Sequence, residues 1–308
     1  MTTPTPDAVR RGRFCLVLAA LLWSVGSLFT RLLTNETSLH LHEPTLTPLQ
    51  ISFFRSLFAG LMFLPLLRGR DLTFRPLMLL MVGCFAIMNA TYLSAMALGP
   101  AANAILLQNT APFWVYLICV YFFRESSDRR SWEAILIGMA GVAVIIAGGW
   151  IRDGFGRFEI TAMGLASGFM YSGVILCLRA LRDHSPEWLT TQNHLGSAIC
   201  LAGAILVLNG PVFWWAWITT PSPRQIGFLA FFGVVQMGLP YLLFTRGLRS
   251  VSPQEAGTIT LLEPILNPLW AYLISPETDT PPPTTWLGGS LILAALAWRY
   301  APRKRPGI

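Results

Sequence analysis

Residues 76–123 read PLMLLMVGCFAIMNATYLSAMALGPAANAILLQNTAPFWVYLICVYFF and contain no charged side chain. A membrane-spanning helix needs about 20 apolar residues, so this stretch is long enough for two spans. Other charge-free stretches cover residues 134–151, 160–178, 188–223, 225–245 and 280–298. The chain is 54% hydrophobic and 12% charged, against about 25% charged residues in a soluble domain. The sequence therefore predicts an all-α polytopic membrane protein.

The apolar windows between proline, glycine and charged residues predict ten transmembrane helices. Their expected ranges are 13–33, 47–67, 76–97, 101–123, 132–150, 160–180, 187–208, 225–246, 253–274 and 284–301. The first window follows three arginines, but no small-residue cleavage site is evident, so we expect a retained helix rather than a signal peptide. The short connections leave no segment for a separate soluble domain, so function is expected inside the bilayer.

The distribution of basic residues predicts the orientation, because arginine and lysine are enriched in cytoplasmic loops. Seventeen of the 22 basic residues fall on the side of the N-terminus, and four fall on the opposite side: Arg31, Arg152, Arg157 and Arg224. Both termini are therefore expected in the cytoplasm of a bacterial-type inner membrane. Residues 209–224 then form an outer loop, whose Trp214, Trp215 and Trp217 are typical of an interfacial belt.

Several classes of function are disfavoured by what the chain lacks. The arginines are scattered singly, so no basic face for nucleic acid is expected. The five cysteines lie inside apolar runs without paired spacing, which argues against disulfides and zinc. No nucleotide-binding Gly-rich loop is present, and the histidine pair of residues 40 and 42 lacks a full ligand set. We expect no cofactor, no metal and no enzymatic activity.

The two halves of the chain, residues 1–150 and 151–308, match weakly but in order. At an offset of 148, Trp23, Ser24 and Arg31 fall on Tyr171, Ser172 and Arg179; at 152, Pro112 and Glu125 fall on Pro264 and Glu277. Five spans per half would make the second copy enter the membrane from the opposite face. The sequence thus predicts two inverted five-helix repeats around a central cavity, an arrangement typical of alternating-access transporters.

These residues resemble the drug/metabolite transporter superfamily in its ten-span EamA-type branch. The resemblance rests on these positions: Trp23-Ser24, Arg55, Ala97-Leu98-Gly99-Pro100-Ala101, Pro112, Glu125, Gly138, Gly141-Val142, Gly247-Leu248, Ala256, Glu263-Pro264, Glu277 and Gly288. Trp23-Ser24 with Tyr171-Ser172 is similar to the YddG-type aromatic amino acid exporters. The resemblance implies a cavity lined by spans one, three, four, six, eight and nine, and a substrate class of amino acids and similar metabolites.

Two charges lie deep inside predicted spans, Arg55 and Glu263. Burying a charge in a membrane is costly, so each should have a partner or a function. Glu263 could bind a substrate ammonium or carry a proton, and Arg55 could bind a substrate carboxylate. Alternatively the two pair with each other and serve the fold.

Uncharged polar and aromatic residues at mid-membrane depth are candidates for the substrate cavity. They are Trp23, Asn89, Tyr92, Gln108, Asn109, Tyr171, Gln236 and Tyr241. Each could instead serve helix packing. Pro112 and Pro264 interrupt the hydrogen-bond ladders of their helices and are candidate kinks or hinges.

The leading functional hypothesis is an exporter of amino acids, aromatic and other, with broad specificity. The alternatives are a cationic drug exporter and a membrane-embedded enzyme. The expected partners are a small-molecule substrate and the lipid bilayer, with no nucleic acid. The sequence leaves the oligomeric state open, and a monomer is compatible with it.

Overall fold

The computed structural model describes residues 5–126, 129–153, 158–251 and 253–300, and this part of the chain is helical without strands. The elements are α1 (Pro6–Ser24), α2 (Gly26–Thr34), α3 (Pro48–Phe63), η1 (Leu64–Leu66), η2 (Gly69–Asp71), α4 (Pro76–Leu98), α5 (Ala101–Gln108), α6 (Ala111–Tyr121), α7 (Arg129–Asp153), α8 (Phe158–Ala180), α9 (Pro186–Thr219), α10 (Pro223–Phe232), the π-helical η4 (Gly233–Gly238), α11 (Leu239–Leu248), α12 (Pro253–Thr260), α13 (Leu262–Ile274), α14 (Pro276–Asp279) and α15 (Pro283–Tyr300). The all-α prediction is confirmed.

Helix starts follow local sequence signals. Proline, whose missing N–H costs nothing in a first helical turn, opens α3, α4, α9 and α10. Thr47 and Gln50 form a capping box at the start of α3, and Ser222 and Gln225 do the same at α10. These caps satisfy backbone N–H groups at helix ends that would otherwise be buried without partners.

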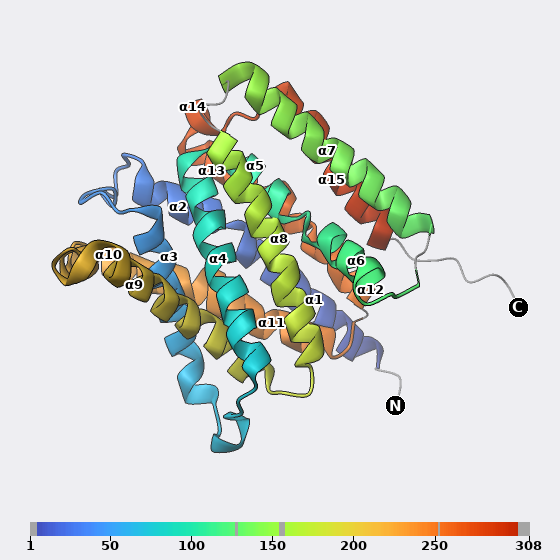
Figure 1. Cartoon of the computed structure of the whole chain (residues 1–308), viewed down its shortest axis with the longest axis horizontal. Coiled ribbons are helices and arrows are strands. Elements are labelled where there is room, and N and C mark those ends of the chain that lie inside the picture. Colours follow the sequence, from blue (N-terminus) through green and yellow to red (C-terminus); the bar gives the residue numbers. More distant parts are fainter. Residues whose placement is uncertain (1–4, 127–128, 154–157, 252, 301–308) are drawn as a thin grey trace, which may run out of the picture.

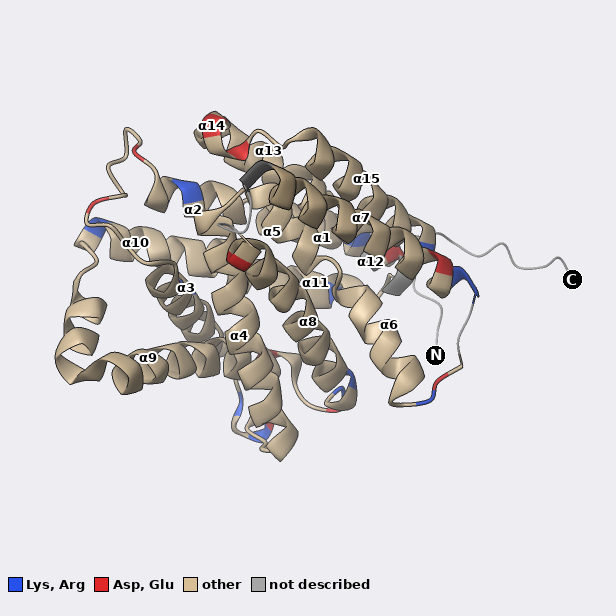
Figure 2. Ribbon diagram, turned by 45° about the horizontal axis from the view of Figure 1, so that its top comes forward, with Lys and Arg blue, Asp and Glu red and all other residues tan. Residues whose placement is uncertain are grey.

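Eight helical segments of the described chain are long and apolar enough to cross a membrane. They are Pro6–Thr34, Pro48–Leu66, Pro76–Leu98, Ala101–Tyr121, Arg129–Ile151, Phe158–Ala180, Pro186–Thr219 and Pro223–Leu248. The ninth and tenth expected spans correspond to α12 with α13 and to α15, which are helical but are not among these eight. The charged residues lie mostly at helix ends and in loops, whereas the middles of the long helices contain few (Figure 2).

The helices pack into one bundle in which segments far apart in the sequence lie side by side (Figure 1). α7 runs along α15, α4 packs against α8 and α9, α3 packs against α9, and α1 packs against α11. One buried apolar cluster centres on α5, α7 and α15, and another joins α2, α3, α9 and α10. Between these apolar regions lie the buried polar residues described below.

The segment 209–224 differs from the loop that the sequence predicts. α9 bends at Gly210, whose φ of 81° is favourable only for glycine, and helical structure continues to Thr219 (Figure 2). Trp217 is buried rather than placed in an interfacial belt, because its indole N–H donates to Thr47 Oγ1 at 3.2 Å. Its backbone carbonyl also accepts a hydrogen bond from Gln50. Trp215, by contrast, is exposed as expected.

The crossing of α7 and α15 supplies a stability prediction. A Cβ atom on Gly288 would lie 2.5 Å from the Gly141 carbonyl oxygen, and a Cβ on Gly141 would meet the Gly288 oxygen at the same distance. Gly288→Ala is therefore expected to lower the free energy of unfolding in detergent by about 1–3 kcal/mol, the usual cost of overpacking. Gly149→Ala on α7 is the control, since nothing lies within 4 Å of its added Cβ. Equal effects of the two substitutions in thermal unfolding would contradict this account of the crossing.

Candidate functional site

A group of polar and charged side chains is enclosed where α3, α4, α9, α11 and α13 converge. We call it the central cluster; it comprises Arg55, Asn89, Tyr92, His194, Gln236, Tyr241, Glu263 and Asn267. Arg55, Asn89, His194 and Asn267 are almost completely buried. Because polar groups are expensive to enclose in an apolar bundle, such a group is the natural candidate for a substrate site.

Arg55 is held by α4. One terminal NH2 group of its guanidinium donates to Asn89 Oδ1, and the guanidinium lies 5.4 Å from the centre of the Phe232 ring. Asn89 is oriented in turn, because its Nδ2 donates to Ser56 Oγ at 2.5 Å. A neutral amide and an aromatic face therefore position the cation without neutralising it, which leaves it able to receive an anion.

Arg55 and Glu263 do not form the direct ion pair that the sequence left open. Among the ion pairs of the described residues none joins them, and the contacts of Arg55 are with Asn89 and Phe232. The physical reason is that α3 presents Arg55 to α4 and η4, whereas Glu263 lies at the start of α13. The two opposite charges thus share one region but remain separate.

Two tyrosines connect the charges. Tyr92 and Tyr241 each lie within electrostatic range of both Arg55 and Glu263. Tyr241 also packs against the Trp23 ring at 5.4 Å and the His194 ring at 5.7 Å, in both cases edge to face. Aromatic rings therefore lie close to both charges, and such rings suit an apolar or aromatic substrate group.

Unsatisfied hydrogen-bonding atoms concentrate in the same region. In the described part of the chain, no partner is found for these buried atoms of the cluster: Arg55 Nε, both ring nitrogens of His194 and Gln236 Oε1. The side chain of Asn267 interacts with Tyr92. Most buried polar groups in folded proteins have at least one partner. A concentration of donors and acceptors without protein partners is what a site for a polar ligand requires.

Interrupted helices bring these residues together. α1 gives way to α2 at Val25, directly after Trp23 and Ser24, and Gln236 lies in the π-helical η4. α12 ends at Thr260 and α13 begins at Leu262, one residue before Glu263. Breaks of this kind free backbone groups inside a membrane and are common at functional sites.

The structure brings together Trp23, Asn89, Tyr92, Gln236, Tyr241 and Glu263 from the candidates of the sequence. Asn109 instead donates to the Ile105 carbonyl of its own helix, at the break between α5 and α6. Gln108 lies at the same break, which packs against Gly168 of α8. Tyr171 packs on an apolar cluster around Phe85 and Met237. Pro112 and Pro264 each follow a break between two helices, so the kinks exist, and a hinge role stays a prediction.

Sequence reasoning missed His194 and Asn267 as members of the cluster. Neither residue was among the candidates selected from the sequence. The missed signal for Asn267 is its spacing, since it lies four residues after Glu263 and so on the same helical face. In the described chain no group of three or more histidine, cysteine or acidic side chains could hold a metal.

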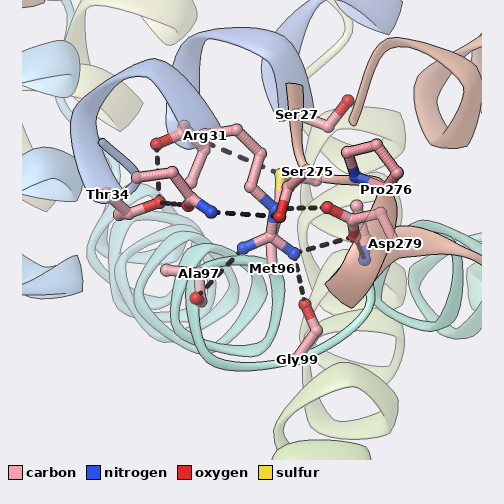
Figure 3. A network of polar contacts seen from close by, with 12 residues as sticks. Ser27, Arg31, Thr34, Met96, Ala97, Gly99, Ser275, Pro276 and Asp279 are labelled. Carbon is pink, nitrogen blue, oxygen red and sulfur yellow. Dashed lines mark hydrogen bonds and ion pairs between the residues drawn. The ribbon is translucent and has the colours of Figure 1, made fainter. Parts of the chain in front are cut away.

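A second polar network lies at one end of the bundle (Figure 3). Arg31 Nε and NH2 donate to the two oxygens of Asp279 at 2.6 and 2.8 Å, and both side chains are nearly inaccessible. Arg31 donates further to the carbonyls of Ala97 and Gly99, and Asp279 accepts from the Ala101 N–H. Arg31, expected on the outer side of the first span, is therefore an internal residue that ties α2 to the α4–α5 junction and to α14.

Comparison with known proteins agrees with this architecture. The model of the EamA-like transporter family matches residues 10–147 and again 160–300. An uncharacterized transporter of Archaeoglobus fulgidus is 31% identical, covering 94% of this chain and 97% of its own length. The pseudopaline exporter CntI of Pseudomonas aeruginosa is 26% identical, covering 94% and 95%. A crystal structure superposes with a TM-score of 0.61 at 18% identity, covering 95% of this chain and 96% of that one, which supports the fold.

Proposed function

Because this chain belongs to the EamA-like transporter family, a family of multi-pass membrane transporters, we propose that it exports amino acids by alternating access. The relatives named as transporters support transport of small metabolites, and the relative named as an exporter supports the direction. The YddG-type preference for aromatic amino acids, within a broad specificity, is part of the proposal.

The observation that carries the substrate class is the separation of opposite charges in the central cluster. Arg55 keeps a buried Nε without a protein partner, and Glu263 forms no ion pair within the described residues. A zwitterion brings both missing partners, its carboxylate for Arg55 and its ammonium for Glu263. Tyr92 and Tyr241 would then line the substrate between its two charged groups.

The membrane arrangement that we propose has ten spans in two inverted repeats, residues 1–150 and 151–308. The ninth span is α12 with α13, and the tenth is α15. Two features support it: the family model matches each half of the chain, and α5–α6 and α12–α13 are broken at equivalent places, just before Pro112 and Pro264. Both termini then lie in the cytoplasm of a bacterial inner membrane, and the end holding α14 is the outer end.

The test is uptake by liposomes that contain the purified protein. A panel of labelled amino acids, with and without a pH gradient, is expected to show saturable flux of neutral amino acids, with large side chains accepted. Protein-free liposomes set the background, and a flux increase under the gradient identifies proton coupling. Flux of quaternary ammonium dyes without amino acid flux would contradict the proposal and favour a cationic drug exporter, a function that the uncompensated Arg55 disfavours.

A further inference from the structure

Two ion pairs, Arg31–Asp279 and Arg179–Glu125, connect segments of the bundle that are far apart in the sequence. Their elements, α14 and the C-terminal end of α8, lie at opposite ends of the bundle (Figure 1). At the end holding α14, Arg31 of α2 pairs with Asp279. At the other end, Arg179 near the end of α8 pairs with Glu125, which follows α6, at 2.8 Å. Each pair joins the end of one helix, α2 or α8, to the segment that follows a broken helix.

The two arginines occupy matching positions in the two halves of the chain, and their carboxylate partners lie in corresponding segments, although Glu125 itself matches Glu277, two residues before Asp279. Arg31 and Arg179 are 148 residues apart, within the offsets at which the halves match. Each carboxylate follows the span that contains the matching prolines, since Glu125 follows α6 and Asp279 follows α13. Each ion pair thus joins the first span of one repeat to the segment after the fourth span of the other repeat.

The surroundings of the two pairs are opposite. The side chains of Arg31 and Asp279 are 2% and 1% exposed, whereas those of Arg179 and Glu125 are 59% and 43% exposed. The Arg31 pair also engages backbone groups of Ala97, Gly99 and Ala101, which close the junction of α4 and α5 around it. Both pairs are formed in this structure, but the Arg31–Asp279 pair is enclosed by protein and the Arg179–Glu125 pair is exposed.

We propose that the two ion pairs are alternating latches: Arg31–Asp279 locks the outer end, and Arg179–Glu125 locks the cytoplasmic end in the opposite conformation. This inference rests on the proposed function, since alternating access is what requires both ends to close in turn. The structure corresponds to the outward-closed conformation. In the outward-open one, Arg31 and Asp279 separate into water while Arg179 and Glu125 become enclosed.

The physical basis is that a buried ion pair gains little net energy over its hydrated partners. Desolvation of the two charges roughly offsets their attraction, so a closed, bonded latch and an open, hydrated latch can have similar free energies. Removing one partner changes this balance, because the remaining charge is costly only while it is buried. Neutralising Asp279 should therefore drive Arg31 toward water and open the outer end.

The first test measures the accessibility of Ser27, which is fully buried one turn before Arg31 and donates to the Asn267 carbonyl at 2.5 Å. A Ser27→Cys reporter is made in full-length protein whose five native cysteines are replaced, and right-side-out membrane vesicles are treated with an impermeant maleimide. Asp279→Asn is expected to raise the labelling rate of the Ser27→Cys reporter about tenfold or more, because the outward-open conformation changes from a minor to a populated state. Labelling at the parental rate would overturn the proposal.

Two charge-neutralising variants are the controls for this experiment. Glu125→Gln loosens the equivalent latch and is expected to leave outer labelling unchanged or lower. Glu133→Gln removes a partner of Arg129 within one helix, a pair that cannot connect moving segments, and should have no effect. An increase as large with Glu133→Gln as with Asp279→Asn would show a general loosening of the fold and would overturn the latch.

A second test keeps both charges, so it does not depend on the folding of Asp279→Asn. Asn35 Nδ2 donates to Ser275 Oγ at 3.0 Å beside the Arg31 pair. In Asn35→Cys with Ser275→Cys, made in the same protein with the native cysteines replaced, a short bis-methanethiosulfonate forms a disulfide with each thiol and releases two methanesulfinate groups. This cross-link is expected to abolish amino acid uptake, and a reductant should restore it. Full uptake by the cross-linked protein would overturn the latch. Absence of amino acid flux in the parent protein would overturn the proposed function alone, because the labelling experiment needs no substrate.

Discussion

Glu263→Gln is expected to cut amino acid uptake by about 10–100-fold, because a hydrogen bond to a charged group is worth about 1.5–3 kcal/mol. Its free energy of unfolding in detergent should stay the same or rise. Glu263 has no ion pair among the described residues, so the change removes a charge that costs about 2.5–3.5 kcal/mol to insert near mid-membrane. Transport and stability should thus move in opposite directions.

The matched control for Glu263→Gln is a substrate without the ammonium group. Phenylalanine uptake should fall, whereas uptake of 3-phenylpropionate, which keeps the ring and the carboxylate, should be unaffected relative to the parent protein. An equal loss for both compounds, or a loss of folded protein in size-exclusion chromatography, would place Glu263 in the fold rather than in substrate binding.

Arg55→Gln is expected to give the complementary loss, about 10–100-fold for amino acids on the same energetic argument. Phenethylamine, which keeps the ring and the ammonium but lacks the carboxylate, should not lose uptake relative to the parent protein. The unfolding free energy should fall by about 1–3 kcal/mol, because Asn89 Oδ1 loses its buried donor. A substitution that affects phenylalanine and phenethylamine equally would rule out carboxylate binding by Arg55.

The double variant Arg55→Gln with Glu263→Gln distinguishes a direct ion pair between the two side chains from separate binding of a substrate by each. A direct buried pair predicts partial rescue, since removing both partners costs less than removing one. The structure shows no such pair, so the stability effects should add within about 0.5 kcal/mol and uptake should not recover. Restored stability in the double variant would show that the two charges do pair in the membrane.

The amino-acid sequence by itself determined the helical elements and several of their interruptions. Apolar runs of span length, closed by prolines and arginines, specify helices locally, since in a membrane the backbone must satisfy its own hydrogen bonds. Pro112 and Pro264 predicted the breaks between α5 and α6 and between α12 and α13, because proline cannot donate the backbone hydrogen bond that a helix interior needs. The candidates Trp23, Asn89, Tyr92 and Tyr241 could likewise be selected from polarity and depth alone.

Only the tertiary structure decided which of these side chains meet. Glu263 was the one carboxylate deep inside a predicted span and was a candidate partner of Arg55, yet Arg55 is bonded to Asn89. The sequence predicted only that Arg31 lies on the outer side of the membrane, whereas the structure shows it buried and paired with Asp279, 248 residues later in the chain. A second helical stretch of α9 reaches Thr219 because Gly210 adopts a non-helical conformation at which the chain kinks. Partner choice depends on how helices rotate and cross, and that follows from the packing of the whole bundle, such as the Gly141–Gly288 contact, which no local pattern encodes.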